Sequence, residues 1–170
     1  MMIIGITAFI IVSVCGAAIC IIRAAEQAER QKYYDAAYKI LKEECLDNAI
    51  KNRNSKMQDA RKLMVYLKWK DTERQRYVFD PADGVWIGRD AQTNNICIRE
   101  GDISLRHCVL YLYQGTVYLE DLHSRNGTRI RRGIRTRRVQ EPCPVFSGDR
   151  IMVGDMVIRV TLFEFDTAYM

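Results

Sequence analysis

The pattern of apolar and polar residues divides the chain into three parts. Residues 1–22 carry no charged side chain and almost no polar one. Residues 24–51 are rich in Ala, Glu, Gln, Lys, Tyr and Leu and contain neither Gly nor Pro, which is typical of a helix. From Arg61 onward, apolar residues alternate with polar ones in short runs, which is typical of strands. The pattern predicts two helical segments followed by an all-β domain.

The first segment is long enough to cross a bilayer. A helix over residues 1–22 would be about 33 Å long, and the hydrocarbon core is about 30 Å thick. A cleaved signal peptide fits less well, because no basic residue precedes the apolar run and no small-residue cleavage site follows it. We therefore predict a transmembrane helix over residues 1–22. Because Arg23, Arg30, Lys32, Lys39 and Lys42 all follow it, we expect the N-terminus outside the cell and the rest in the cytoplasm.

Residues 23–60 are predicted to form a helical juxtamembrane linker. Tyr34, Tyr38, Leu41 and Cys45 recur at spacings of four, three and four residues, which places them on one helix face. This stripe could dock on the domain or on another helix, or form a short coiled-coil seam. Because it is short and continues into polar residues, we take a solvated stalk as the default. The polar residues 51–56 predict a hinge.

The third part is predicted to be a β-sandwich. Turn-forming residues, mainly Gly, Asp and Pro, separate about ten short apolar segments between residues 61 and 166. Many short strands with frequent turns are typical of an all-β sandwich. We place one domain at residues 61–166 and a C-terminal tail at residues 167–170.

Composition narrows the expected chemistry. The net charge is +5, and the six cysteines include no Cys-x-x-Cys pair and are accompanied by only two histidines. This spacing is not that of a metal site, and we expect the cysteines to be small apolar residues in a reducing compartment rather than disulfides. The sequence also lacks a Gly-rich phosphate-cradling helix start and paired carboxylates placed for acid–base chemistry. We predict neither an enzyme nor a metal or other cofactor.

Three predicted loops carry polar residues that suit an oxyanion. Gly88-Arg89 ends one apolar segment, Ser104 to His107 precedes another, and Asp121 to Thr128 reads as a tight turn. Arginine offers a fork of N–H groups to phosphate oxygens, and serine adds a neutral donor. Asparagine offers both a donor and an acceptor to the backbone of an extended peptide. Asn126-Gly127 supplies the turn, because Gly enters the left-handed region without a steric cost.

The order Gly-Arg, Ser-x-x-His, Asp-Leu-x-Ser-x-Asn-Gly-Thr and a final Gly148-Asp149 resembles the forkhead-associated (FHA) domain family, over about Arg61 to Phe165. Members of that family are β-sandwiches that bind phosphothreonine peptides. The resemblance implies that Arg89 and Ser104 contact the phosphate and that Asn126 grips the peptide backbone. Neighbouring cations complete the expected phosphopeptide-binding set: Arg89, Ser104, Arg106, Arg125 and Asn126. The expected structural supports of this site are Gly88, His107, Gly127 and Thr128.

One position departs from the family pattern. The residue after the motif serine is often polar or basic and contributes to phosphate or peptide contacts, whereas here it is Leu105. The arrangement still looks like small membrane-tethered FHA proteins of bacteria. We therefore expect a membrane-anchored adaptor that recruits a phosphothreonine-containing protein, such as a Ser/Thr kinase or its substrate, to the cytoplasmic face of the cell membrane. Leu105 keeps open the alternative of a phosphate-independent membrane scaffold.

Six arginines lie within ten residues around a predicted hairpin turn at Arg132-Gly133. The resemblance implies that the hairpin tip lies away from the peptide loops, towards the chain termini and the tether. We consider a contact with anionic lipid, to which each cation can contribute about 1 kcal/mol; an acidic protein, nucleic acid or a solvated hairpin are the alternatives. Aromatic residues are not interleaved with these arginines, so we expect no nucleic acid. The cluster consists of Arg129, Arg131, Arg132, Arg135, Arg137 and Arg138.

Overall fold

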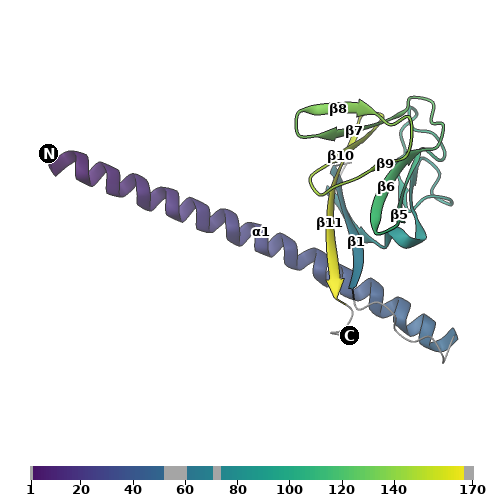
Figure 1. Ribbon diagram of the computed structural model, residues 1–170, viewed down its shortest axis with the longest axis horizontal. Coiled ribbons are helices and arrows are strands. Elements are labelled where there is room, and N and C mark those ends of the chain that lie inside the picture. The colour runs from purple at the N-terminus through teal and green to yellow at the C-terminus, as the bar shows by residue number, and fades with distance from the viewer. Residues whose placement is uncertain (1, 52–60, 71–73, 167–170) are drawn as a thin grey trace.

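The computed structural model of the protein describes residues 2–51, 61–70 and 74–166, with the backbone alone at residues 2–15, 41–51 and 74–76. A long helix, α1 (Met2–Lys51), precedes the strands. Figure 1 shows α1 crossing one side of a β-sandwich, with its N-terminal part extending well beyond the sandwich. The predicted all-β sandwich is confirmed, and the helical prediction for residues 24–51 is also met.

Two sheets form the sandwich. The first sheet has the strand order β2-β1-β11-β10-β7-β8, and the second has the order β4-β3-β5-β6-β9. The strands of the first sheet are β1 (Arg61–Lys70), β2 (Arg74–Phe79), β7 (Thr128–Arg132), β8 (Arg135–Arg138), β10 (Arg150–Val153) and β11 (Met156–Asp166). Those of the second sheet are β3 (Val85–Gly88), β4 (Ile96–Cys97), β5 (Cys108–Tyr113), β6 (Thr116–Asp121) and β9 (Cys143–Pro144), and a 3-10 turn, Pro81–Asp83, precedes β3.

The main core lies between the two sheets. Alternate residues of each strand face inward, so Ile158 and Val160 of β11 pack with Leu67 of β1 and with Leu110 and Leu119 of the second sheet, all fully buried. Burying each such aliphatic side chain stabilises the fold by roughly 1.5–3 kcal/mol relative to its exposure. The core therefore holds the strand ends, and the loops that leave them, in fixed positions.

The first sheet also has an apolar patch on its outer face, which α1 covers. Met64 and Tyr66 of β1 point outward beside Phe163 of β11, and Tyr33 and Ala37 of α1 pack on them. The Tyr33 ring centroid lies 5.0 Å from that of Tyr66 and 4.8 Å from that of Phe163. Ala37 is fully buried, and its small side chain lets the helix approach the sheet closely.

The solvated stalk that the sequence suggested as a default is therefore wrong for the docked part of α1. Docking was the alternative, and Tyr34 of the expected stripe does contact the sheet, with its ring centroid 5.0 Å from that of Phe163. The most deeply buried residues are nevertheless one position away: Tyr33 and Ala37 are buried, whereas Tyr34 and Tyr38 are 37% and 43% exposed. The reason is that the outward-facing aromatic and apolar residues of the sheet determine which helix residues are buried, and the sequence pattern of the helix does not reveal those sheet residues. The side chains of Leu41 and Cys45, and most of the predicted hinge, lie outside the described residues.

The predicted transmembrane segment, residues 1–22, coincides with the start of α1. Residue 1 and the side chains of residues 2–15 lie outside the described part of the chain. Among the residues that are described, no helix combines the length and the apolar character needed to cross a membrane.

We expect Ala37→Glu to detach α1 from the sheet, because it would bury a carboxylate against Met64 and Val78 without a paired cation. The free energy of unfolding should fall by about 2–4 kcal/mol. Amide hydrogen exchange over residues 29–40 should rise at the same time. Lys39→Glu is the matched control, because Lys39 is exposed on the same helix. Equal effects of the two substitutions would contradict the observed docking face.

Candidate functional site

Three loops meet at one end of the sandwich, and Ser104 joins them. Its carbonyl oxygen accepts a hydrogen bond from the Arg89 backbone N–H at 2.9 Å, and its hydroxyl oxygen accepts one from the Arg125 backbone N–H at 3.0 Å. The Asn126 side-chain amide donates to the carbonyl oxygen of Asp102 at 2.7 Å. The loop after β3, the loop before β5 and the loop after β6 are thereby fastened to one another, although they lie far apart in sequence.

The side chains at this junction leave donors and charges facing outward. Arg89, Arg125 and Asn126 are exposed, and Ser104 is half-buried. Because the Ser104 oxygen acts as an acceptor for Arg125, its hydroxyl hydrogen is left to donate elsewhere. Among the described residues, no carboxylate forms an ion pair with Arg89 or Arg125. The junction is therefore a cationic, donor-rich surface suited to an anion.

A half-buried carboxylate shapes the loop after β6. Asp121 accepts hydrogen bonds from the hydroxyls of Ser124 and Thr128, both at 2.6 Å, and from the Ser124 backbone N–H at 3.1 Å. Burial alone would raise the pKa of the Asp121 carboxyl, but these hydrogen bonds, aided by His107, lower it below its ordinary value.

Gly127 has φ +76°, and an added Cβ there would meet the Arg138 guanidinium.

A fully buried imidazole supports the same end of the sandwich. The Nδ1 atom of His107 accepts a hydrogen bond from the Ser104 backbone N–H at 3.2 Å. The His107 backbone N–H donates to Ile87, and its carbonyl oxygen accepts from Leu122, both at 2.9 Å. Burial lowers the pKa of His107, and the Gly127 backbone and the carboxylates of Asp121 and Asp102 oppose that shift only in part. A neutral ring with an acceptor at Nδ1 matches this arrangement.

Gly88 sits where two loops nearly touch. A Cβ at this position would collide with the carbonyl oxygen of Leu105, a backbone atom that cannot rotate away. The Asn94 side-chain amide holds the same two loops by donating to the carbonyl oxygens of Asp90 and Leu105, both at 2.7 Å. The close approach of the loops accounts for a glycine at the end of β3.

Arg106 and Leu105 behave differently from the other predicted site residues. The Arg106 guanidinium carbon lies 3.9 Å from the Trp86 ring centroid, a cation–π contact that restrains the side chain. Leu105 is 60% exposed, so an apolar side chain stands beside the junction.

The structure thus brings together Arg89, Ser104 and Asn126, with the backbone of Arg125. Arg106 is held separately, against the Trp86 ring. Sequence reasoning missed Asn94, Asp102 and Trp86 as partners of the predicted residues. Asp102 contributes a backbone carbonyl, which no residue type signals, and Asn94 lies in a loop without a motif. Trp86 could have been noticed as an aromatic residue in an otherwise aliphatic strand. Among the described residues, no group of His, Cys, Asp and Glu side chains could hold a metal ion.

Comparison with known proteins relates part of the chain to a family. Residues 85–154 match the model of the FHA domain. No curated protein gives a match to the chain. Similar solved structures include EmbR of Mycobacterium tuberculosis in complex with a low affinity phosphopeptide (22% identity, TM-score 0.50) and the FHA domain of the CT664 protein from Chlamydia trachomatis (19%, 0.51). The FHA domain of a hypothetical protein from Arabidopsis thaliana is also similar (20%, 0.55).

These three similarities cover 67%, 58% and 66% of this chain, respectively. The match spans 28% of the EmbR chain and 96% of each of the other two chains. At such identities they show a shared fold.

We expect Gly88→Ala to lower the free energy of unfolding by about 2–3 kcal/mol, because its Cβ would force the Leu105 backbone away. Gly101→Ala is the matched control: it lies in the neighbouring loop with open space around it and should change stability by no more than about 0.5 kcal/mol. Denaturant unfolding of both variants tests this, and a harmless Gly88→Ala would show that the two loops are not in close contact.

Acidification should destabilise the domain through His107. Its pKa in the folded protein lies below the ordinary value of 6.5, so the stability that the neutral ring contributes is present above pH 6.5 and is lost as the pH falls from there towards the folded pKa. The chain has two histidines, so NMR titration of His123→Gln follows His107 alone. A His107 pKa at or above 6.5 would contradict this expectation.

Proposed function

Because residues 85–154 of this chain are an FHA domain, we propose that the protein is an adaptor that binds phosphothreonine peptides. The observation that carries the proposal is the junction of the three loops, where Ser104 is fastened to the backbones of Arg89 and Arg125. A fixed junction of this kind can present a guanidinium, a hydroxyl and a carboxamide to one peptide. Binding by EmbR of a phosphopeptide, on a related fold, supports the same interpretation.

Each of the three side chains has a distinct role in this proposal. Arg89 donates paired N–H groups to the phosphate, and its exposure and the lack of a carboxylate partner among the described residues favour this role. Ser104 donates its free hydroxyl hydrogen to another phosphate oxygen. Asn126 is anchored by one N–H to Asp102, so its carbonyl oxygen is held in place to accept a backbone N–H of the peptide.

Arg125 and Arg106 extend the surface on which the peptide lies. Arg125 is exposed, and its backbone is fixed by Ser104, so its guanidinium can reach the phosphate or an acidic peptide side chain. Arg106 is held over Trp86 and offers a restrained cation to a residue further along the peptide. Gly88, His107, Gly127 and Thr128 act indirectly, by fixing the loop backbones.

Recruitment to a membrane is the second element of the proposal. The uncharged residues 1–22 would anchor the chain as a single-pass protein with the FHA domain on the cytoplasmic side. A partner phosphorylated by a Ser/Thr kinase, or the kinase itself, would then be concentrated at that surface. The arginines of the β7–β8 hairpin are all exposed and would contact anionic lipid, apart from Arg132, whose guanidinium is paired with Asp149.

Leu105 favours one alternative function. Its side chain is 60% exposed at the junction of the loops and offers an apolar contact where a polar one would assist phosphate binding. A partner that relied on this contact would bind without phosphorylation, which would make the protein a membrane scaffold. The two functions differ in whether binding requires the phosphate.

The test is binding of the full chain, in detergent micelles, to a library of phosphothreonine peptides and to the same peptides without phosphate. We expect binding that depends on the phosphate, and Arg89→Ala should weaken it by at least about tenfold, because a charge-assisted hydrogen bond contributes about 1.5–3 kcal/mol. Arg135→Ala, which removes the same charge from the exposed hairpin, should leave it unchanged. Equal affinity for phosphorylated and unphosphorylated peptides would favour the scaffold.

A further inference from the structure

The part of the outer sheet face that α1 leaves uncovered carries a row of cations on neighbouring strands. Arg159 of β11 lies directly opposite both Lys68 of β1 and Arg150 of β10, and Arg150 lies opposite Arg131 of β7. Side chains directly opposite each other point to the same face, with Cβ atoms roughly 5 Å apart. Lys70 adds a cation two residues beyond Lys68 on the same face. We call this surface the basic groove.

Among the residues described, the protein neutralises the basic groove only at one end. Glu29 of α1 pairs with Lys68 at one end of the row. Within the described part of the chain, no carboxylate lies within ion-pair distance of Arg150, Arg159 or Arg131. Like charges directly opposite each other on neighbouring strands destabilise a sheet. An anion bound from outside would relieve this repulsion.

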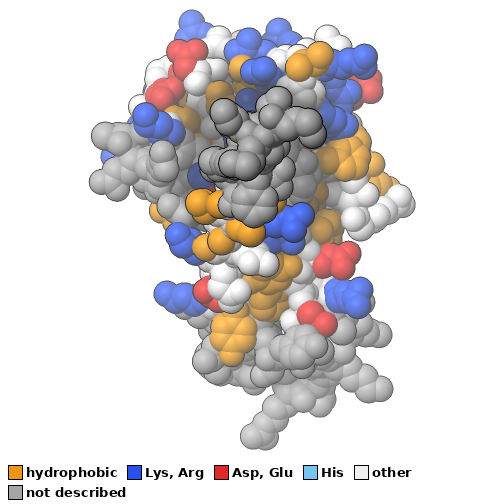
Figure 2. Space-filling model, turned by 90° about the vertical axis from the view of Figure 1, so that its left-hand side faces the viewer, with side chains coloured by type: hydrophobic (Ala, Val, Ile, Leu, Met, Phe, Trp, Pro, Cys, Tyr) orange, Lys and Arg blue, Asp and Glu red, His pale blue; other side chains and the backbone are white. Residues whose placement is uncertain are grey.

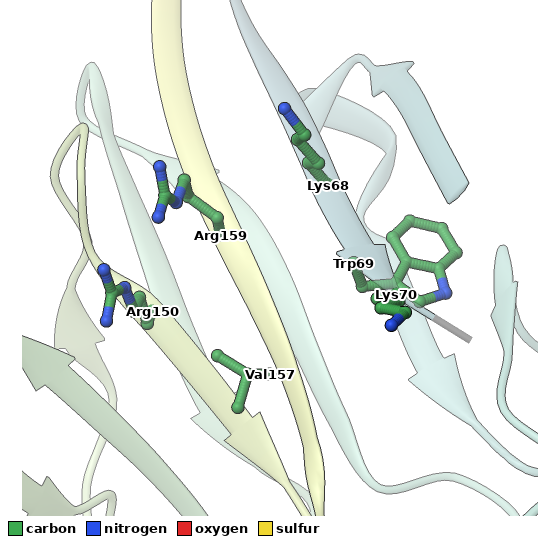
Figure 3. A pocket seen from close by; sticks show the side chains of 6 residues that line it. All are labelled: Lys68, Trp69, Lys70, Arg150, Val157 and Arg159. Atoms are coloured by element: carbon green, nitrogen blue, oxygen red, sulfur yellow. The ribbon is translucent and has the colours of Figure 1, made fainter. Parts of the chain in front are cut away.

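The basic groove includes an open depression with room for an anionic group. A depression of about 460 Å³ lies on this face, lined by Lys68, Trp69, Lys70, Arg150, Val157 and Arg159. Figure 3 shows the guanidinium groups of Arg150 and Arg159 side by side, extending in the same direction from neighbouring strands. Val157 is 43% exposed beside them, so the cations border an apolar surface. A second depression, of about 280 Å³, shares Lys68 and Arg159 and continues to Glu26, Glu29 and Arg30 of α1.

The position of the groove indicates where such an anion would come from. In Figure 1 the first sheet is the left-hand layer, so its outer face looks towards the side to which the N-terminal part of α1 extends. Figure 2 views the molecule from that side and shows Lys and Arg side chains gathered in its upper part, where the β7–β8 hairpin lies. Arg131 of the hairpin lies opposite Arg150 of the groove, so the groove and the hairpin adjoin on the side towards which the N-terminal part of α1 extends.

We propose that the basic groove binds the phosphate of an anionic membrane lipid, with Arg150 and Arg159 as its principal ligands and Lys70 at its edge. The inference deepens the proposed membrane attachment and rests on it. A phosphate carried by a lipid also accounts for the exposed Val157, which would face the apolar part of the interface. Nucleic acid is disfavoured, because the aromatic residue at the groove, Trp69, is only 7% exposed and cannot stack with a base.

The test uses the full chain in lipid nanodiscs of phosphatidylcholine alone, or with about one third phosphatidylglycerol. An amine-acylating reagent followed by mass spectrometry measures the accessibility of Lys70, and Lys39 on α1 serves as the internal reference. We expect labelling of Lys70 to be at least about threefold slower in the anionic discs. Arg150→Gln/Arg159→Gln should abolish this protection, whereas Lys32→Gln/Arg99→Gln, which removes the same charge from exposed positions outside the groove and the hairpin, should retain it.

Several results would overturn the proposal. These are equal labelling in the two kinds of disc, equal loss of protection in both double variants, or failure of the chain to associate with the discs. Inorganic phosphate or duplex DNA that gave the same protection in neutral discs would assign the groove to a free anion or to nucleic acid instead. Arg150→Gln/Arg159→Gln should not lower the unfolding temperature, because it removes repulsion between like charges.

Measuring phosphothreonine-peptide binding on the same samples shows whether lipid binding at the basic groove and peptide binding at the three loops fail independently. Arg89→Ala should lose the peptide and keep the protection of Lys70, whereas Arg150→Gln/Arg159→Gln should do the reverse.

Discussion

The hydrogen bond from the Ser104 backbone to His107 Nδ1 is the interaction on which the loop end of this sandwich depends. It requires a neutral imidazole, and burial supplies that condition by disfavouring the charged ring. The His107 backbone also forms hydrogen bonds with Ile87 and Leu122. One side-chain and two backbone hydrogen bonds of His107 therefore set the spacing of three loops. Ser104 in turn fixes the Arg125 backbone, whose N–H donates a hydrogen bond to the Ser104 hydroxyl oxygen. The exposed residues are positioned by contacts that lie beneath them.

The first sheet uses its two faces for different purposes. Its inner face contributes to the sandwich core, and its outer face is divided between an apolar patch under α1 and a row of cations. Such a division is possible because a strand exposes alternate residues to opposite sides, so that β1 can bury Val65 and Leu67 while Tyr66 supports the helix and Lys68 borders the groove. The three loops around Ser104, the helix and the cations thus occupy separate surfaces of one small domain.

Sequence reasoning was most successful where local chemistry dictates structure. Turn residues and alternation predicted the sandwich, and the Asn126-Gly127 turn was expected because few residues adopt a left-handed backbone at low cost. It failed where a partner distant in sequence decides the outcome. Tyr33 packs on both Tyr66 and Phe163, which are distant from it in sequence, and the anchor of Asn126 is a carbonyl group that every residue possesses. The basic groove was missed for the same reason, since Lys68, Arg150 and Arg159 meet only through strand register.

The docking of Tyr33 and Ala37 has a mechanical consequence. A domain on a flexible linker can take any orientation around its attachment point. This domain is instead packed against a continuous helix that runs from Met2 through the docked turns. The helical rise of about 1.5 Å per residue makes the part of α1 from Met2 to Tyr33 roughly 47 Å long. Tilting or rotating this part of α1 would swing the three loops along an arc of fixed radius. The direction in which they face would then be set by the helix rather than by diffusion of the domain.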